Sequence, residues 1–297
     1  MDVIEHSSEL GQWRVTQRRA DARLHAYVHG YLASEGYRHE AVRERHLPST
    51  EVALLINFGA PHRTLTTETQ RWTTFDGAWV VGLHSTHHLT EAVGDRRFMV
   101  VRFSPIGAHL FLRVPMDLIE NQTVELAQFD PKLARLLRTR LAAALNWETR
   151  FDVMESVVAE RVISMASEVE VVLEAWKRLR DAHGRIGLGL LASELHCSHR
   201  HLITQFRAGV GLLPKTIARL LRFNRAVQVV NRLGRDVTIE PASRPYIEVA
   251  KAASSGGAQI RWAEVAADCG YFDQSHFIKE FQEFSGLTPV EFLRQER

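Results

Sequence analysis

The stretch IRWAEVAADCGYFDQSHFIKEFQEFSGLTP, residues 260–289, is predicted to form two short helices joined by a tight turn. Gly270 can adopt the left-handed backbone conformation that ends a helix, and Asp273 can cap the helix that follows. The second helix carries one apolar stripe, made of Phe277, Phe281 and Phe284. Its opposite face is polar, which is the pattern of a helix-turn-helix.

The same pattern occurs upstream, in residues 189–214. Ala192 and Ala266 are 74 residues apart, whereas the later positions are 75 apart, so the second turn is one residue longer. A helical hairpin packed in a core is an alternative for either copy alone, but chance packing does not explain a repeat. The pairs at the constant separation of 75 are His201 and His276, Leu202 and Phe277, Phe206 and Phe281, Gly211 and Gly286, and Pro214 and Pro289.

On these residues, the chain resembles the tandem helix-turn-helix domain of AraC/XylS-type transcription regulators. The segment GYFDQSHFIKEFQEFSGLTP (270–289) is close to the signature of that family, and CSHRHLITQFRAGVGLLPKTIARLLRFNRA (197–226) resembles its first copy with the connecting helix. The resemblance covers about residues 168–297. Phe272 stands where the family usually has Ser, so we expect Asp273 to act as the cap.

The resemblance implies that each recognition helix enters a major groove, with two successive grooves about 34 Å apart. Arg200 suits the edge of guanine and Gln274 the edge of adenine. We expect further DNA contacts from basic residues of the first copy and of the connecting helix, namely Arg207, Lys215, Arg219 and Arg222. Simple solvation is the alternative for each of these side chains. Matched position by position, the base-reading residues are Arg200, Ile203 and Thr204 in the first copy and Gln274, Ser275, Ile278 and Lys279 in the second.

The net charge of +2 hides an uneven distribution. Residues 185–235 hold nine Arg or Lys and one acidic residue, whereas residues 259–297 hold four and seven. We therefore predict that the first copy supplies most of the phosphate contacts. Asp273, Glu280 and Glu283 are expected to weaken binding by the second copy, because carboxylates near a phosphate backbone repel it.

Length and composition indicate a globular protein of one large or two ordinary domains, with 297 residues and 45% hydrophobic side chains. The sequence contains neither an apolar run of about 18 residues nor a secretion signal, so we expect a cytoplasmic protein without membrane contact. Cys197 and Cys269 both fall in the predicted turns, and we expect both to be buried thiols.

The N-terminal half is predicted to be rich in β-strands. Apolar and β-branched runs indicate strands, and a helical period begins at Pro131. The predicted fold class is α+β, with a β-rich domain over 1–166 and an all-α domain over 167–297; the resemblance implies a cupin-like jelly roll for the former. A Pro- and Gly-containing insert at 235–258 is predicted to be a surface loop. Strands are expected at 13–18, 24–31, 51–58, 63–69, 79–83, 97–103 and 124–126, and a short helix at 106–113.

We expect an effector pocket inside the β-rich domain, lined mainly by apolar strand residues. The same domain holds a group of histidines with Glu91, but its spacing would send His84 and His87 to opposite faces of a strand. We therefore predict no metal and expect solvated or hydrogen-bonded histidines, in a loop after His84. The candidate pocket residues are Leu54, Ile56, Phe58, Trp79, Val81, Val100 and Phe103, although core packing is the favoured interpretation for most of them. The histidine group is His84, His87 and His88, with His62 and His109 elsewhere.

These observations predict a sequence-specific DNA-binding transcription regulator that is modulated by a small effector or a partner at its N-terminal domain. Double-stranded DNA is the expected partner, with a second copy of the chain and RNA polymerase as further candidates. No catalytic residues and no cofactor are expected. Two alternatives stay open, namely a metal-dependent β-barrel enzyme with a helix-turn-helix tail, and a small-molecule binding module whose DNA binding is lost. The effector, the operator and the sign of regulation do not follow from the sequence.

Overall fold

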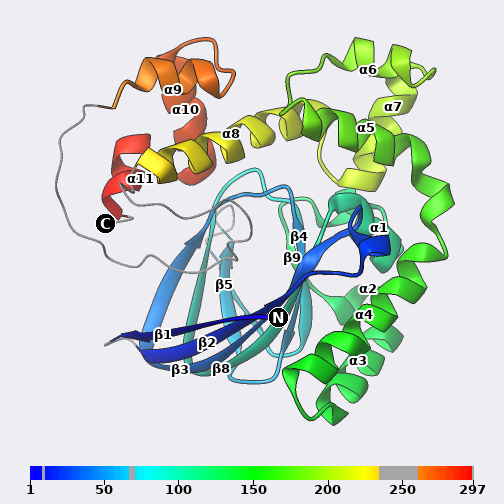
Figure 1. Ribbon diagram of the computed structural model, residues 1–297, viewed down its shortest axis with the longest axis vertical. Coiled ribbons are helices and arrows are strands. Elements are labelled where there is room, and N and C mark those ends of the chain that lie inside the picture. The colour runs from blue at the N-terminus through cyan, green and yellow to red at the C-terminus, as the bar shows by residue number, and fades with distance from the viewer. Residues whose placement is uncertain (9–10, 67–70, 234–259, 296–297) are drawn as a thin grey trace.

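The computed structural model describes residues 1–8, 11–66, 71–233 and 260–295. An antiparallel sheet forms the first part of the chain, and helices form the rest (Figure 1). The change from strand to helix comes at Glu125 and Leu126, so the predicted α+β class is confirmed. The predicted insert at 235–258 lies outside the described residues. None of the described helices is long and apolar enough to cross a membrane.

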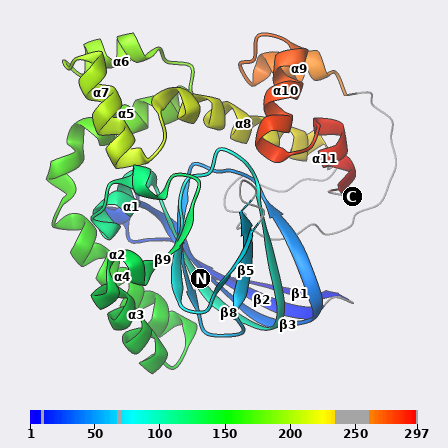
Figure 2. The ribbon, with the colours of Figure 1, turned by 180° about the vertical axis from the view of Figure 1, so that it is seen from behind.

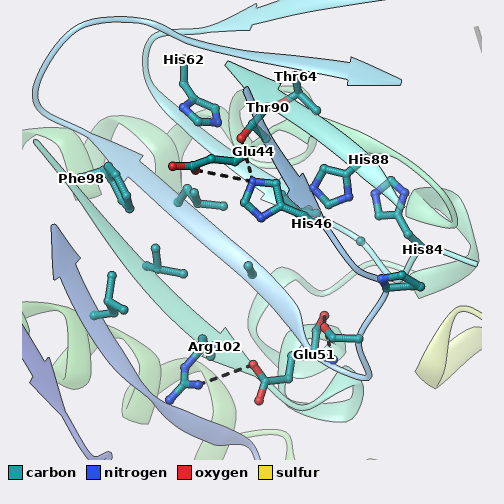
Figure 3. Close-up of a pocket in the computed structure, with 18 of the residues that line it drawn as sticks. Glu44, His46, Glu51, His62, Thr64, His84, His88, Thr90, Phe98 and Arg102 are labelled. Atoms are coloured by element: carbon teal, nitrogen blue, oxygen red, sulfur yellow. Dashed lines mark hydrogen bonds and ion pairs between the residues drawn. The ribbon is translucent and has the colours of Figure 1, made fainter. Parts of the chain in front are cut away.

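The nine strands form one sheet with the path β1-β2-β3-β8-β4-β7-β9, and β5 joins it by pairing with β8 and β6. Two long strands, β3 and β8, pair with each other along most of their length and carry the shorter ones. The sheet thereby curls, and five of its strands contribute to the wall of one cavity (Figure 3). The strands are β1 (Asp2–Ser8), β2 (Gly11–Arg18), β3 (Val28–His46), β4 (Val52–Asn57), β5 (His62–Thr66), β6 (Arg71–Phe75), β7 (Ala78–Val81), β8 (His88–Phe103) and β9 (Thr123–Glu125).

The outer face of this sheet packs against helices. Along β4, Val52, Leu54 and Ile56 are buried and share a core with residues of these helices, such as Phe111 and Phe151. Among the leucines of the helical period that begins at Pro131, Leu133, Leu137 and Leu141 are buried, whereas Leu136 and Leu145 are exposed. The elements that follow or flank the sheet are the 3-10 helices η1 (Ala22–Leu24), η2 (Met116–Ile119) and η3 (Ala166–Val169) and the helices α1 (Pro105–Leu112), α2 (Leu126–Phe129), α3 (Pro131–Ala143) and α4 (Trp147–Ile163).

The C-terminal helices form two units, and α8 (Pro214–Leu233) runs from one to the other (Figures 1 and 2). Phe223 of α8 packs on Phe281 and Phe284, with ring centroids 5.3 and 5.0 Å apart, so the connecting helix is part of the core of the second unit. The first unit contains α5 (Glu170–Asp181), α6 (Leu188–Glu194) and α7 (His199–Val210), and the second contains α9 (Trp262–Asp268), α10 (Gln274–Ser285) and α11 (Pro289–Gln295).

Several strands are longer than predicted, and two extend into segments that carry no apolar signal. The strand expected at 97–103 begins at His88, so the loop expected after His84 is wrong from that residue onward. Strand β3 runs to His46 through a segment with few apolar residues, and β1 lies where no strand was expected. These segments pair with neighbours in the sheet while their polar side chains face the cavity or solvent, so their sequences lack apolar alternation.

Candidate functional site

The two helix-turn-helix units have similar turns, and each turn has one residue in the left-handed backbone region. In the first unit this residue is His196, with φ 50°, and in the second it is Gly270, with φ 83°. Ser198 Oγ accepts a hydrogen bond from the His201 backbone N–H at 3.1 Å, and a carboxylate oxygen of Asp273 accepts one from that of His276 at 2.7 Å. The predicted cap at Asp273 is confirmed, and the extra residue of the second turn, Phe272, is 94% exposed.

Most of the predicted base-reading side chains lie on the open faces of α7 and α10. Ile203 and Ile278, which occupy the same position in the two copies, are half-buried, and Ile278 packs against the core. Among the described residues, no ion pair or hydrogen bond joins the cationic groups of Arg200, Lys215 and Lys279 to a carboxylate, so these cations are available to an anionic partner. The exposed members of the predicted set are Arg200, Thr204, Gln274, Ser275 and Lys279.

Two of the predicted DNA contacts are bound inside the protein instead. Arg219 donates from Nε to Glu280 at 2.9 Å and from its terminal nitrogen to Glu283 at 2.7 Å. Arg222 lies 3.6 Å from the other oxygen of Glu280, whose side chain is only 3% exposed. These ion pairs join the connecting helix to α10, because both carboxylates project toward α8. The carboxylate of Glu280 is therefore neutralised from α8, which disfavours the expected repulsion of a phosphate backbone, and Arg219 and Arg222 are not free cations.

Arg207 also differs from the prediction, since it faces the N-terminal domain. Its guanidinium lies 3.8 Å from a carboxylate oxygen of Asp117 and 3.6 Å from one of Glu120. Both acids belong to η2 or directly follow it, and η2 lies beside the C-terminal turn of α7. Arg207 thus helps to hold the first recognition helix on the β-rich domain.

The C-cap glycines of the two recognition helices are both contact points with the N-terminal domain. A Cβ on Gly211 would lie 2.9 Å from the carbonyl oxygen of Met116 in η2. A Cβ on Gly286, the equivalent residue, would clash with the ring of His87. The backbone N–H of His87 donates to the Phe284 carbonyl at 2.9 Å, and Arg45 donates to that of Ser285 at 2.9 Å. Each recognition helix is therefore held by its C-terminal turn, while its N-terminal part is open.

The N-terminal domain contains a cavity of about 80 Å³, which exceeds the roughly 10–15 Å³ needed to hold one water. On β4, the residues predicted to line the cavity point the other way. Ala53 and Leu55 face the cavity, whereas Leu54 and Ile56 lie in the outer core. Of the seven predicted pocket residues, only Val81 and Val100 line it. Its apolar part consists of Leu32, Ala53, Leu55, Val81, Phe98 and Val100.

Four histidines line the polar end of the cavity (Figure 3). His46 and His88 stack with ring centroids 5.0 Å apart, and His84 lies 4.8 Å from His88. His62, from β5, completes the group, whereas His87 and His109 do not line the cavity. The sequence prediction had missed His46, because it lies in the polar part of β3 that carried no strand signal. No three His, Cys, Asp or Glu side chains of the described segments are placed to hold a metal ion.

Burial keeps these imidazoles neutral at pH 7. Burial lowers the pKa of His46, His62 and His84 to about 4, and that of His88 well below its ordinary value. Next to them, Glu44 is bound by Arg96 at 3.2 Å and by Arg38. Burial raises the pKa of Glu44, but the charges of the two guanidinium groups outweigh burial, so this pKa lies below its ordinary value.

We predict that acid destabilises this domain through the buried histidines. Their pKa is lower in the folded than in the unfolded chain, so their contribution to stability is complete above about pH 6.5 and is lost as the pH falls toward 4. Each such histidine changes the free energy of unfolding by about 1.4 kcal/mol per pH unit in that window. Urea unfolding between pH 7.5 and 4.5 should therefore show a smaller slope for His62→Gln than for the parent chain. An unchanged slope in His62→Gln would contradict the prediction, and His39→Gln, at an exposed position of β3, is the control.

Comparison with known proteins covers both parts of the chain. Residues 258–294 match the family model described as bacterial regulatory helix-turn-helix proteins, AraC family, which confirms the resemblance for the second unit. Residues 16–125 match a model described as a domain of unknown function, DUF6597. No curated protein matches the sequence.

Similar solved structures include ToxT from Vibrio cholerae, with 7% identity, a TM-score of 0.43 and coverage of 96% of this chain and 98% of that chain. Another is a transcriptional regulator from Chromobacterium violaceum, described among AraC-type DNA-binding domain-containing proteins, with 19% identity and a TM-score of 0.32 over 44% of this chain and 96% of that chain. The C-terminal domain of AraT, a response regulator from Geobacillus stearothermophilus, has 17% identity and a TM-score of 0.31 over 42% of this chain and 85% of that chain.

Proposed function

We propose that this chain, whose helix-turn-helix region belongs to the AraC family of bacterial regulators, binds double-stranded DNA in a sequence-specific manner and regulates transcription. The observation that carries the proposal is the duplicated pair of recognition helices with open N-terminal parts. These parts of recognition helices are the ones that contact base edges in a major groove. Among the described residues, Arg200 and Lys279 on these two helices have no ion-pair partner, while the carboxylate of Glu280 is buried and that of Glu283 is paired with Arg219.

The inward-facing acids bear on the alternative in which the second copy has lost DNA binding. That alternative was motivated by the negative charge of residues 259–297. Glu280 and Glu283 are neutralised by Arg219, and Asp273 is used as a helix cap. The remaining open face of α10 carries Lys279 and polar side chains, and this favours two working recognition helices.

We further propose that the domain over 1–166 binds a small effector in its cavity and thereby modulates DNA binding by residues 167–297. The proposal is supported by the contacts of this domain with the C-terminal turns of α7 and α10. Through these contacts, a change in the domain can act directly on both recognition helices. A second copy of the chain and RNA polymerase are proposed as further partners, with the protein acting in the cytoplasm. A metal-dependent enzyme is the less favoured function, since the cavity histidines are not arranged around a common metal position.

The test is selection of genomic DNA fragments by the purified full chain, followed by affinity measurements on one selected site over a salt series. Enrichment of a defined sequence is expected, and the logarithm of the affinity should fall linearly with that of the salt concentration. Absence of any enriched sequence, both with and without cell extract as a source of effector, would contradict the proposal.

On such a site, Arg200→Ala is expected to cost about 1–3 kcal/mol of binding free energy and to relax specificity at one base pair. Lys215→Ala is expected to weaken all sequences alike and to reduce the salt slope by about 1, because its cation is free to meet a phosphate. Lys132→Ala, which removes an exposed cation from α3, is the matched control. Equal losses on specific and random DNA for Arg200→Ala would show that Arg200 contacts the backbone only.

A further inference from the structure

Two ring nitrogens at the histidine end of the cavity have no hydrogen-bond partner among the residues that the structure describes. His84 Nε2 and His88 Nδ1 are both inaccessible to solvent and make no hydrogen bond, and the two residues are only 8% and 4% exposed. Buried polar atoms are nearly always hydrogen-bonded, because an unsatisfied one retains the full cost of its desolvation. These two nitrogens therefore point to a molecule that occupies the cavity and supplies the missing bonds.

The partners of His84 indicate which kind of group is missing. A hydrogen bond with the backbone of Gln122 opposes the effect of burial on the pKa of His84, as a carbonyl acceptor does. Because Nε2 has no partner among the described residues, we assign this bond to Nδ1, which then carries the proton of the neutral ring. His84 Nε2 is then an acceptor with a free lone pair. The occupant must supply an O–H or N–H donor at this position.

The charged side chains that line the cavity are paired with one another, which favours an uncharged occupant. Glu44 is bound by Arg96 at 3.2 Å, and Glu51 lies 3.9 Å from Arg102 (Figure 3). The histidines are neutral, so they offer no cation to a carboxylate and no anion to an amine. A charged molecule would lose its hydration without gaining an opposite charge. The rest of the wall, which includes Leu55 and Phe98, suits an apolar body.

The same two strands that carry this end of the cavity also hold the second recognition helix. On β3, Glu44 and His46 line the cavity, and Arg45 between them donates to the carbonyl of Ser285 at 2.9 Å. His46 pairs in register with His88 of β8, and the residue before His88 bonds to the carbonyl of Phe284. Alternation of side chains along a strand places these contacts on the side opposite to the cavity. A displacement of His46 and His88 is therefore expected to shift Arg45 and His87, which contact the C-terminal turn of α10.

We propose that the cavity binds a small uncharged molecule that donates an O–H or N–H hydrogen bond to His84 Nε2, and that Arg45 and His87 relay its presence to α10. This inference rests on the proposed function, since it names the ligand class and the route of regulation at the proposed effector site. The proposed relay acts on the second helix-turn-helix unit, because Arg45 and His87 contact the C-terminal turn of α10 directly.

The ligand class is tested with three single-ring probes on the full chain at pH 7.5, by saturation-transfer NMR with titration. Phenol is uncharged and carries a donor, anisole is uncharged without a donor, and benzoate is an anion. Phenol is expected to bind about three- to tenfold more tightly than anisole, as one hydrogen bond allows, and benzoate no more tightly than anisole. His84→Ala should make phenol and anisole bind equally, while His39→Ala should leave the preference intact. Tightest binding of benzoate, a phenol preference that survives His84→Ala, or no binding of any probe would each overturn the ligand class.

The relay is tested by hydrogen–deuterium exchange of residues 281–288 with and without saturating phenol. Exchange in this segment is expected to change in the parent chain and in Arg43→Ala. Arg43 lies two residues along β3 from Arg45 and binds Glu91 instead of α10, so it is the matched control. Arg45→Ala should still bind phenol, but the change in exchange should disappear. A bound phenol without any change in the parent chain, or a change that persists in Arg45→Ala, would overturn the relay. Neither readout involves DNA, so failure of the DNA selection would count against the proposed function separately.

Discussion

Replacing Glu44 by alanine is expected to lower the free energy of unfolding of the N-terminal domain by about 3–5 kcal/mol, the range for removing one partner of a buried ion pair. Its carboxylate is bound by Arg38 and Arg96, whose side chains are only 2% and 7% exposed. Without it, two buried guanidinium groups lose the carboxylate that they share. Urea unfolding followed by near-ultraviolet circular dichroism would measure the loss, and hydrogen exchange of β3 and β8 would locate it.

Glu91→Ala is the matched control for Glu44→Ala. Glu91 also lies on the β3–β8 pair and also binds two arginines, Arg43 and Arg63, but their side chains are 67% and 48% exposed. The Glu91 side chain is itself only 13% exposed, but both arginines stay hydrated when it is removed, so the control should cost less than Glu44→Ala, about 1 kcal/mol. If the two variants lost similar amounts of stability, burial of the Glu44 cluster would not be the source of its strength.

Replacing Glu280 by alanine is expected to destabilise the second helix-turn-helix unit by about 3 kcal/mol, at the lower end of the range for a broken buried pair. Glu280 accepts a hydrogen bond from Arg219 at 2.9 Å and lies 3.6 Å from Arg222 and 3.5 Å from His276. These contacts hold α10 on α8, so DNA affinity should fall together with stability. The measurements are hydrogen exchange of α10 and affinity for a selected DNA site.

Two models of the negative charge on α10 differ in whether Glu280→Ala strengthens or weakens DNA binding. If Glu280 repelled the phosphate backbone, its removal would strengthen DNA binding. The structure predicts the opposite, because the carboxylate faces α8 and keeps the recognition helix in place. Glu283→Ala is the control, since Glu283 binds the same Arg219 but is 49% exposed and should cost less than about 1 kcal/mol. Stronger DNA binding by Glu280→Ala would restore the repulsion model.

Local chemistry explains why the helix-turn-helix units could be predicted from the sequence. A helix cap and a left-handed turn residue act within a few positions of the chain, as Asp273 and Gly270 do, so their roles follow from residue type and spacing. The apolar stripe of α10 also follows from its period, since Phe277, Phe281 and Phe284 are all buried. The duplication then made the assignment specific, because the same local signals recur in the same order.

The cavity could not be predicted in this way. A strand has two faces with the same period, so Leu54 and Leu55 are equivalent in sequence, and only the packing of helices on the outer face decides that Leu55 lines the cavity. The histidines come from four segments of the chain, and pairing between β3, β5 and β8 brings His46, His62 and His88 together. Strand pairing over such separations leaves no local signal.

The amino-acid sequence alone thus determined the α+β class, the repeated helix-turn-helix and its caps, because these depend on contacts between residues close in the chain. Only the tertiary structure decided which charges are free. Arg207, Arg219 and Arg222 belong to the same basic segment as Arg200, yet each of the three meets a carboxylate from a distant segment. Net charge counts residues regardless of direction, whereas an ion pair depends on which side chains the fold brings within about 4 Å of each other.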